Sequence, residues 1–151
     1  MADQWTVMVV SSDLENRRSI ARILASQGFD PICAANVKEC REILDKRDVS
    51  LVFCDHKLAD GDYRDIQASV LQTPQKQKPR LVLMSGLMKP EEYQEAKRSG
   101  IFEVIGLPCR PTNIEWTIIL AKRDERSRTN QLLRITSLNS SRGKPAAAGM
   151  S

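Results

Sequence analysis

The sequence predicts an α/β fold: a doubly wound, five-stranded parallel sheet flanked by helices. The first observation is that short β-type runs alternate with helical patterns along most of the chain, as in successive βα units. The second is that three of these runs, VMVV at 7–10, LVFC at 51–54 and LVLM at 81–84, are almost continuously apolar. Such runs are typical of strands that are buried on both faces of a parallel sheet.

Five segments are expected to form the strands, at residues 5–10, 31–35, 50–54, 80–85 and 101–105. The second segment contains Pro31, which has no backbone N–H to donate to a neighbouring strand. We therefore place this strand at an edge of the sheet. Cys33 and Cys54 lie within strand-like runs, and we expect both to be buried free thiols.

Capping residues indicate where the helices begin and end. Asp13 is suited to cap a helix over 14–27 that stops at Gly28, and Asn36 is suited to cap a helix over 37–44. The other three helices are expected over 63–71, from Pro90 to Gly100, and from Pro111 onward.

The excess of positive charge lies near the C-terminus. The formal net charge is +4, and residues 121–151 contain seven basic and two acidic side chains, so residues 1–120 carry −1. From Ser137 the sequence is small, polar and without periodicity, which predicts disorder. We therefore expect a domain over 1–125, then a basic helical extension with a disordered tail over 126–151. No aromatic residues interleave with the basic ones, so nucleic-acid binding is not expected.

Composition and pattern exclude several classes of protein. No apolar run approaches the roughly 20 residues that a membrane span needs, and the N-terminus lacks the pattern of a signal peptide. A soluble, cytoplasmic protein is therefore expected. The four cysteines and the single histidine, His56, do not have the spacing of a zinc site. No GxGxxG motif follows the first strand and no P-loop motif occurs, so nucleotide binding is not expected.

Polar residues stand at the expected carboxyl ends of neighbouring strands, where doubly wound sheets bind their ligands. Asp55 follows the run LVFC, and Ser85 follows the run LVLM. A carboxylate on a rigid strand end can act as a nucleophile toward a phosphoryl group, and a nearby hydroxyl can donate to a phosphoryl oxygen. Taken singly, Asp55 is also compatible with a helix cap, and Ser85 with a turn before a glycine.

Four segments together resemble the receiver domain of bacterial two-component response regulators, related to the chemotaxis response regulator. They are VMVVSSD (7–13), LVFCDHKLADGD (51–62), LVLMSG (81–86) and SGIFEVIGLP (99–108). The resemblance covers about residues 5–121 and implies a flavodoxin-like strand order of 2-1-3-4-5. It also implies that Asp55 is the phosphoacceptor, that Ser85 is the conserved hydroxyl residue, and that Pro108 follows a cis peptide bond.

The sequence departs from that family at positions that the phosphorylation chemistry uses. Ser11 and Ser12 occupy the positions of the two acids that hold Mg²⁺ in the family, and Asp13 comes one residue late. Leu107 occupies the position of the lysine before the proline, and Val104 that of the switch aromatic. Mg²⁺ is typically anchored by one or two carboxylates, and phosphoryl transfer depends on charge neutralisation. We therefore expect weak metal binding or none.

Four further residues of this region have alternative interpretations. Lys57 is a candidate to contact a phosphoryl group, or a solvated surface lysine. Arg110 is a candidate for a displaced cation, although Leu107 lies in the better register. His56 is interpreted as a loop or packing residue, and Cys109 as a structural thiol rather than a redox-sensitive one.

The leading hypothesis is a single-domain, receiver-like signalling protein of a two-component phosphorelay. It would act by protein–protein contact, with atypical or absent Mg²⁺-dependent phosphorylation. The alternative is an ordinary response regulator that a histidine kinase phosphorylates on Asp55. The expected partners are a histidine kinase or phosphotransfer protein, or a protein target bound without phosphorylation; a homodimer is a further option. No cofactor is expected except Mg²⁺ if the altered site still binds it, and no enzymatic role beyond the chain's own phosphoryl transfer.

Overall fold

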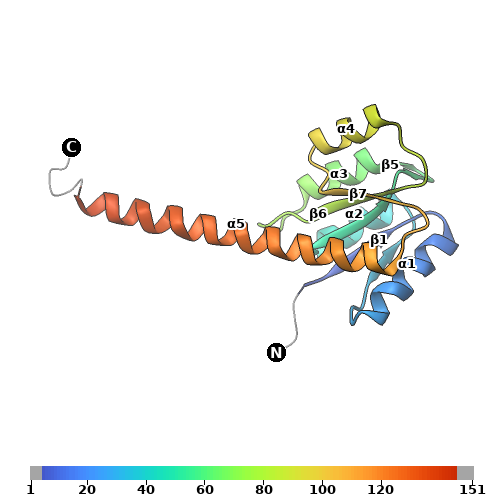
Figure 1. The fold of residues 1–151 in the computed structure, drawn as a ribbon, viewed down its shortest axis with the longest axis horizontal. Coiled ribbons are helices and arrows are strands. Elements are labelled where there is room, and N and C mark those ends of the chain that lie inside the picture. Colours follow the sequence, from blue (N-terminus) through green and yellow to red (C-terminus); the bar gives the residue numbers. More distant parts are fainter. Residues whose placement is uncertain (1–4, 146–151) are drawn as a thin grey trace. The chain divides into compact units, whose positions relative to one another are not determined.

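The structure is a computed structural model that describes the backbone of residues 5–145 and the side chains of residues 5–128. Its main sheet has five parallel strands in the order β2-β1-β3-β6-β7 (Figure 1). They are β1 (Val7–Val10), β2 (Ile32–Ala34), β3 (Leu51–Asp55), β6 (Arg80–Ser85) and β7 (Glu103–Gly106). The predicted fold is confirmed, and β2 lies at the edge where Pro31 placed it.

Five helices occur in the described part of the chain: α1 (Leu14–Ser26), α2 (Val37–Lys46), α3 (Tyr63–Gln72), α4 (Pro90–Arg98) and α5 (Pro111–Pro145). The predicted caps are in place. The Asp13 carboxylate accepts from two backbone N–H groups of the first turn of α1, and the Asn36 side chain accepts from the Glu39 N–H. Gly28 follows α1 with a φ of 92°, a left-handed conformation that glycine adopts without strain. None of the helices within 5–145 has both the length and the apolar character needed to cross a membrane.

Both faces of the sheet are buried. Met8, Val10 and Val52 belong to a core cluster that includes side chains of α2, α3 and α4. Val9 and Phe53, which alternate with them along the strands, are also fully buried. Figure 1 shows α3 and α4 on one side of the sheet and α1 on the other. This double-sided core holds the carboxyl ends of β1, β3 and β6 side by side at one edge of the sheet.

A small hairpin follows β3, and the sequence did not predict it. Its strands, β4 (Lys57–Leu58) and β5 (Gly61–Asp62), pair antiparallel. At its turn, the carboxylate of Asp60 accepts from the backbone N–H groups of Val37 and Lys38 at 2.8 and 3.1 Å. These two hydrogen bonds connect the hairpin after Asp55 to the first turn of α2.

Helix α5 crosses the boundary between two compact units, Met1–Ile118 and Ile119–Ser151. In the second unit the helical backbone continues to Pro145, so residues 137–145 are helical where the sequence predicts disorder. Once a helix has nucleated, each further residue adds a hydrogen bond, and most of the small polar residues cost only about 0.5 kcal/mol each. The end of the predicted tail, residues 146–151, lies outside the described residues. The division expected at 125/126 stays a prediction.

The four cysteines are free thiols. Cys40, Cys54 and Cys109 are buried, but Cys33 is exposed, so the burial predicted for Cys33 is wrong. The strand β2 pairs with β1 alone at the sheet edge. Ala34 belongs to the core cluster and Ile32 packs against it, whereas Cys33 between them alternates to the other face. An apolar run at an edge therefore does not imply two covered faces.

Candidate functional site

Asp55 ends the strand β3 at the carboxyl edge of the sheet. The strand is buried as far as Cys54, and Asp55 is its first half-buried residue. Asp55 pairs in register with Met84 of β6, the residue before Ser85. Because β3 lies between β1 and β6, the carboxylate is held in a fixed place among three strand ends.

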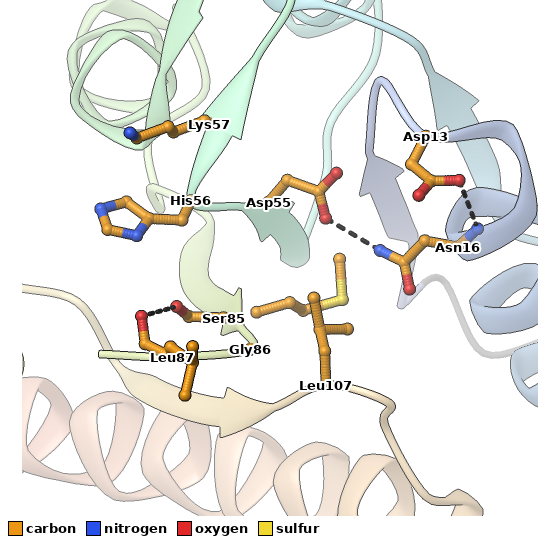
Figure 2. A pocket seen from close by; sticks show the side chains of 10 residues that line it. Asp13, Asn16, Asp55, His56, Lys57, Ser85, Gly86, Leu87 and Leu107 are labelled. Atoms are coloured by element: carbon orange, nitrogen blue, oxygen red, sulfur yellow. Dashed lines mark hydrogen bonds between the residues drawn. The ribbon is translucent and has the colours of Figure 1, made fainter. Parts of the chain in front are cut away.

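Two neutral side chains donate to the Asp55 carboxylate. The fully buried Ser11 hydroxyl, directly after β1, donates to Asp55 Oδ2 at 2.5 Å. The Asn16 amide, in the first turn of α1, donates to Asp55 Oδ1 at 2.8 Å, and Figure 2 shows these two side chains pointing toward one another. Each oxygen of the carboxylate therefore has a donor from the chain itself.

Burial raises the pKa of the Asp55 carboxyl group above its ordinary value. The hydrogen bonds from Ser11 and Asn16 lower this pKa because they stabilise the charged form, and the nearby charge of Asp13 raises it. Within the described part of the chain, no ion pair includes Asp55, and no cation is among the main causes of its shift. Asp55 therefore holds its proton more readily than an ordinary aspartate does.

Ser12 and Asp13, which follow Ser11, are engaged in other contacts. The Ser12 hydroxyl donates to the Ala35 carbonyl at 2.6 Å and accepts from the Ala59 N–H at 2.8 Å. It thus joins the β1–α1 loop to the segment after β2 and to the hairpin. Asp13 Oδ1 accepts from the first turn of α1 at 2.9 and 3.2 Å, as its predicted cap role requires.

Ser85, His56 and Lys57 surround the same site without contacting the carboxylate. The Ser85 hydroxyl donates to the carbonyl of Leu87 in its own loop at 3.3 Å. Figure 2 shows Lys57 and His56 pointing away from the β3 carboxylate, and Lys57 is exposed. The His56 ring packs edge-on against Tyr63, with 5.4 Å between ring centroids, which agrees with its interpretation as a packing residue.

The remaining candidate residues lie on and after β7. The peptide bond between Leu107 and Pro108 is cis, as the resemblance predicts. Val104 is half-buried and packs against the core cluster. Arg110 is exposed, and it does not line the space beside Asp55. Burial raises the pKa of the Cys109 thiol to about 12, as expected for a structural rather than a reactive cysteine.

An open pocket of about 280 Å³ lies beside the Asp55 carboxylate. Asp13, Lys57 and Ser85 also line it, together with the apolar Leu87 and Leu107. The pocket therefore gathers five of the predicted site residues at one edge of the sheet: Asp13, Asp55, Lys57, Ser85 and Leu107. The residues that do not line it are Ser11, Ser12, Val104, Pro108 and Arg110.

These residues do not fit the usual ligand set of Mg²⁺. The ion takes oxygen ligands in near-octahedral geometry and is commonly anchored by one or two carboxylates. Asp55 offers one carboxylate, but both its oxygens already accept from neutral donors, and the Asp13 carboxylate caps a helix. Among the residues that the structure describes, no group of three or more Asp, Glu, His or Cys side chains is placed to hold a metal ion.

Sequence reasoning did not single out Asn16, although it is a direct partner of Asp55. Asn16 is the third residue after the cap Asp13, where Glu or Gln would complete a capping box. An asparagine at that position could have served as a signal for a site residue, because its short side chain reaches Asp55 at the end of β3 and not the backbone of the cap residue Asp13.

No protein-family model matches the chain. Two curated proteins named NtrX-like response regulators, from Rickettsia bellii and Rickettsia felis, are each 29% identical to it, over 119 and 122 residues. The alignments cover 78% and 80% of this chain but 24% and 25% of the relatives, so the chain spans about a quarter of their length.

Solved structures of low sequence identity share the fold. A CheY-like response regulator receiver domain from Methanospirillum hungatei is 20% identical, with a TM-score of 0.70 over 83% of this chain and 98% of that chain. The receiver domain of NtrX from Brucella abortus is 23% identical, with a TM-score of 0.64 over 78% and 95% of the two chains. With its five-stranded order and its cis-proline, the chain has the fold of the CheY-like response regulator receiver domains.

Proposed function

We propose that this chain is a signalling component of a two-component phosphorelay that acts by binding other proteins, with Mg²⁺-dependent phosphorylation of Asp55 absent or strongly weakened. The observation that carries this proposal is the pair of hydrogen bonds from Ser11 and Asn16 to the Asp55 carboxylate. A metal ion at Asp55 would share each oxygen with a neutral donor, and among the described residues the one other carboxylate that lines the pocket is that of Asp13, whose Oδ1 caps α1.

The electrostatics of the pocket support the same proposal. Phosphoryl transfer depends mainly on positioning and on neutralising the charge of the transferred group. A phosphoryl group at Asp55 would add negative charge close to Asp13, while Lys57 points away and Leu107 is neutral. Without a cation the barrier to transfer stays high, and a role in protein contact does not require that transfer.

An ordinary phosphoacceptor is the second candidate, and one observation favours it. Asp55 is half-buried rather than enclosed, and it opens into a pocket that Ser85 also lines. In that case an Asp55 oxygen would form a bond to phosphorus while the bond from phosphorus to a kinase histidine nitrogen breaks. The Ser85 hydroxyl would have to leave the Leu87 carbonyl to reach the transferred group.

Intact mass spectrometry after incubation with Mg²⁺ and acetyl phosphate separates the two candidates. The wild-type chain is compared with Asp55→Asn and with Asp60→Asn, a matched loss of one negative charge in the hairpin turn after β3. We expect no Mg²⁺-dependent modification of the wild-type chain. Stoichiometric, Mg²⁺-dependent modification that is retained in Asp60→Asn and lost in Asp55→Asn would establish the ordinary phosphoacceptor instead.

A further inference from the structure

The pocket beside Asp55 has an acidic centre and no inward-pointing cation. Its carboxylates belong to Asp13 and Asp55, and its single basic side chain, Lys57, is exposed and directed away from Asp55 (Figure 2). Arg17 of α1 donates to the backbone carbonyl of Ser11 at 2.7 Å. The chain therefore leaves the charge of Asp55 without a cationic partner among its described residues.

The Asp55 carboxylate retains capacity for further donors. An ionised carboxylate offers about four lone-pair sites, two on each oxygen. Ser11 supplies one donor to Oδ2 and Asn16 supplies one to Oδ1. A compact cation with several N–H donors can therefore bind without displacing either neutral partner, and it would compensate the burial that now raises the pKa of this group.

Apolar walls stand around this acidic centre. Leu107 is half-buried and lines the pocket, and Leu87 lines it while remaining 94% exposed. Leu14, the neighbour of the pocket residue Asp13 in the chain, is 47% exposed. Exposed leucines beside a charged pocket are typical of surfaces that another protein covers.

We propose that the pocket binds the ammonium group of a lysine side chain that a protein partner presents. The ammonium pairs with Asp55, and its aliphatic stem lies against Leu87 and Leu107. Lysine matches this pocket better than arginine. A compact ammonium can bind at one free lone-pair site of the carboxylate, whereas a bidentate guanidinium must bind both oxygens at once, and each oxygen already accepts from a neutral donor. The inference rests on the proposed function, in which no metal ion fills the site.

NMR titration with N-acetyl-lysine-N′-methylamide tests this inference at constant ionic strength and without Mg²⁺. The norleucine analogue, which lacks the ammonium group, is the neutral probe, and the arginine analogue is the competing cation. We expect saturable shifts of the Ser85, Gly86 and Leu107 amides and of the Asn16 side-chain amide with the lysine probe. Asp55→Asn should weaken its binding about tenfold, which is about 1.4 kcal/mol. Asp60→Asn should leave it unchanged.

A second variant keeps the test independent of any folding defect in the first. Leu107→Lys places a cation inside the pocket and should also weaken binding of the lysine probe, because the internal ammonium competes for Asp55. The inference is overturned by an absence of saturable shifts, by equal shifts with the norleucine probe, or by tighter binding of the arginine probe. The titration contains no phosphodonor, so its result is independent of the acetyl phosphate experiment. If the chain binds the lysine probe but is phosphorylated in that experiment, only the proposed function is overturned. If the chain does not bind the probe and is not phosphorylated, only this inference is overturned.

Discussion

Two neighbouring aspartates, Asp55 at the end of β3 and Asp60 in the turn of the hairpin that follows, are used in opposite ways. Asp60 is exposed, and the backbone N–H of Val37, followed by that of Lys38, lowers its pKa. Asp55 is half-buried, and its burial raises its pKa despite two donors of its own. The difference teaches that the environment of a carboxylate decides its role. Backbone N–H donors make Asp60 a stable anion that attaches the hairpin to α2, whereas burial without a cationic partner among the described residues disfavours the charged form of Asp55.

Hydrogen bonds attach the hairpin after β3 to neighbouring segments of the chain. Asp60 and Ser12 fasten the hairpin to α2 and to the β1–α1 loop. Asp55 itself is held by β3, between β1 and β6, and the Ser12 hydroxyl is engaged in contacts with Ala35 and Ala59.

The largest expected effect comes from introducing the charges that the resemblance implies for this site. Ser11→Asp with Ser12→Asp and Leu107→Lys should raise Mg²⁺ affinity at least about tenfold, because it adds two carboxylates beside Asp55. Isothermal titration calorimetry measures the affinity, with circular dichroism to confirm that the variant folds. The same set combined with Asp55→Asn is the control and should lose most of the gain. A folded variant with unchanged Mg²⁺ affinity would show that the ligand set is not what limits this site.

Removing the hydroxyl of Ser11, one of the two donors to Asp55, has the next largest effect. Ser11→Ala should lower the free energy of unfolding by about 1.5 kcal/mol, because a buried hydrogen bond to a charged group is lost. Urea unfolding of Ser11→Ala, Asp55→Asn and the double variant gives the coupling between the two residues. We expect the loss to be smaller in the Asp55→Asn background. Strictly additive effects would contradict the contact.

Neutralising Asp55 should stabilise the chain at neutral pH. The folded-state pKa is raised, so the folded chain binds more protons than the unfolded chain, and stability falls as pH rises from the ordinary aspartate pKa through the raised value. Asp55→Asn removes that loss, with a gain of no more than about 1 kcal/mol because solvent screens a half-exposed group. The gain should vanish below the ordinary pKa. Thermal unfolding at several pH values measures it, and a gain that persists in acid would point to another cause.

Neutralising Asp60 should give the smallest effect, and one of opposite sign. Its folded-state pKa is lowered, so it contributes stability above the ordinary aspartate pKa, and that contribution is lost as pH falls toward the lowered value. Asp60→Ala should therefore destabilise the chain at neutral pH, and Asp60→Asn, which keeps one acceptor for the N–H groups at the start of α2, should destabilise it less. Equal losses in both variants would show that the hydrogen bonds do not matter.

The sequence predicted what depends on local pattern. Continuous apolar runs placed the three central strands, Pro31 placed the edge strand, and Asp13 and Asn36 capped their helices as expected. These features follow from backbone hydrogen bonding and burial within one element, which the sequence displays directly.

The sequence did not predict what depends on contacts between distant segments. The donation from Asn16 to Asp55 spans 39 residues, and the bridge from Ser12 to the Ala59 N–H spans 47. The hairpin after β3 was missed because its two-residue strands carry no periodicity of their own. Such contacts exist only once the sheet has brought the loops together, so the site could be located from the sequence while its hydrogen bonding could not.

Titration of the Asp55 carboxyl carbon by NMR, with and without millimolar Mg²⁺, tests the central claim most directly. Asp55→Asn serves to assign the resonance. If Ser11 and Asn16 hold a half-buried carboxylate in place of a metal ion, its pKa lies above that of an ordinary aspartate and stays unchanged when Mg²⁺ is added. A pKa at or below the ordinary value, or a clear decrease on adding Mg²⁺, would contradict the account.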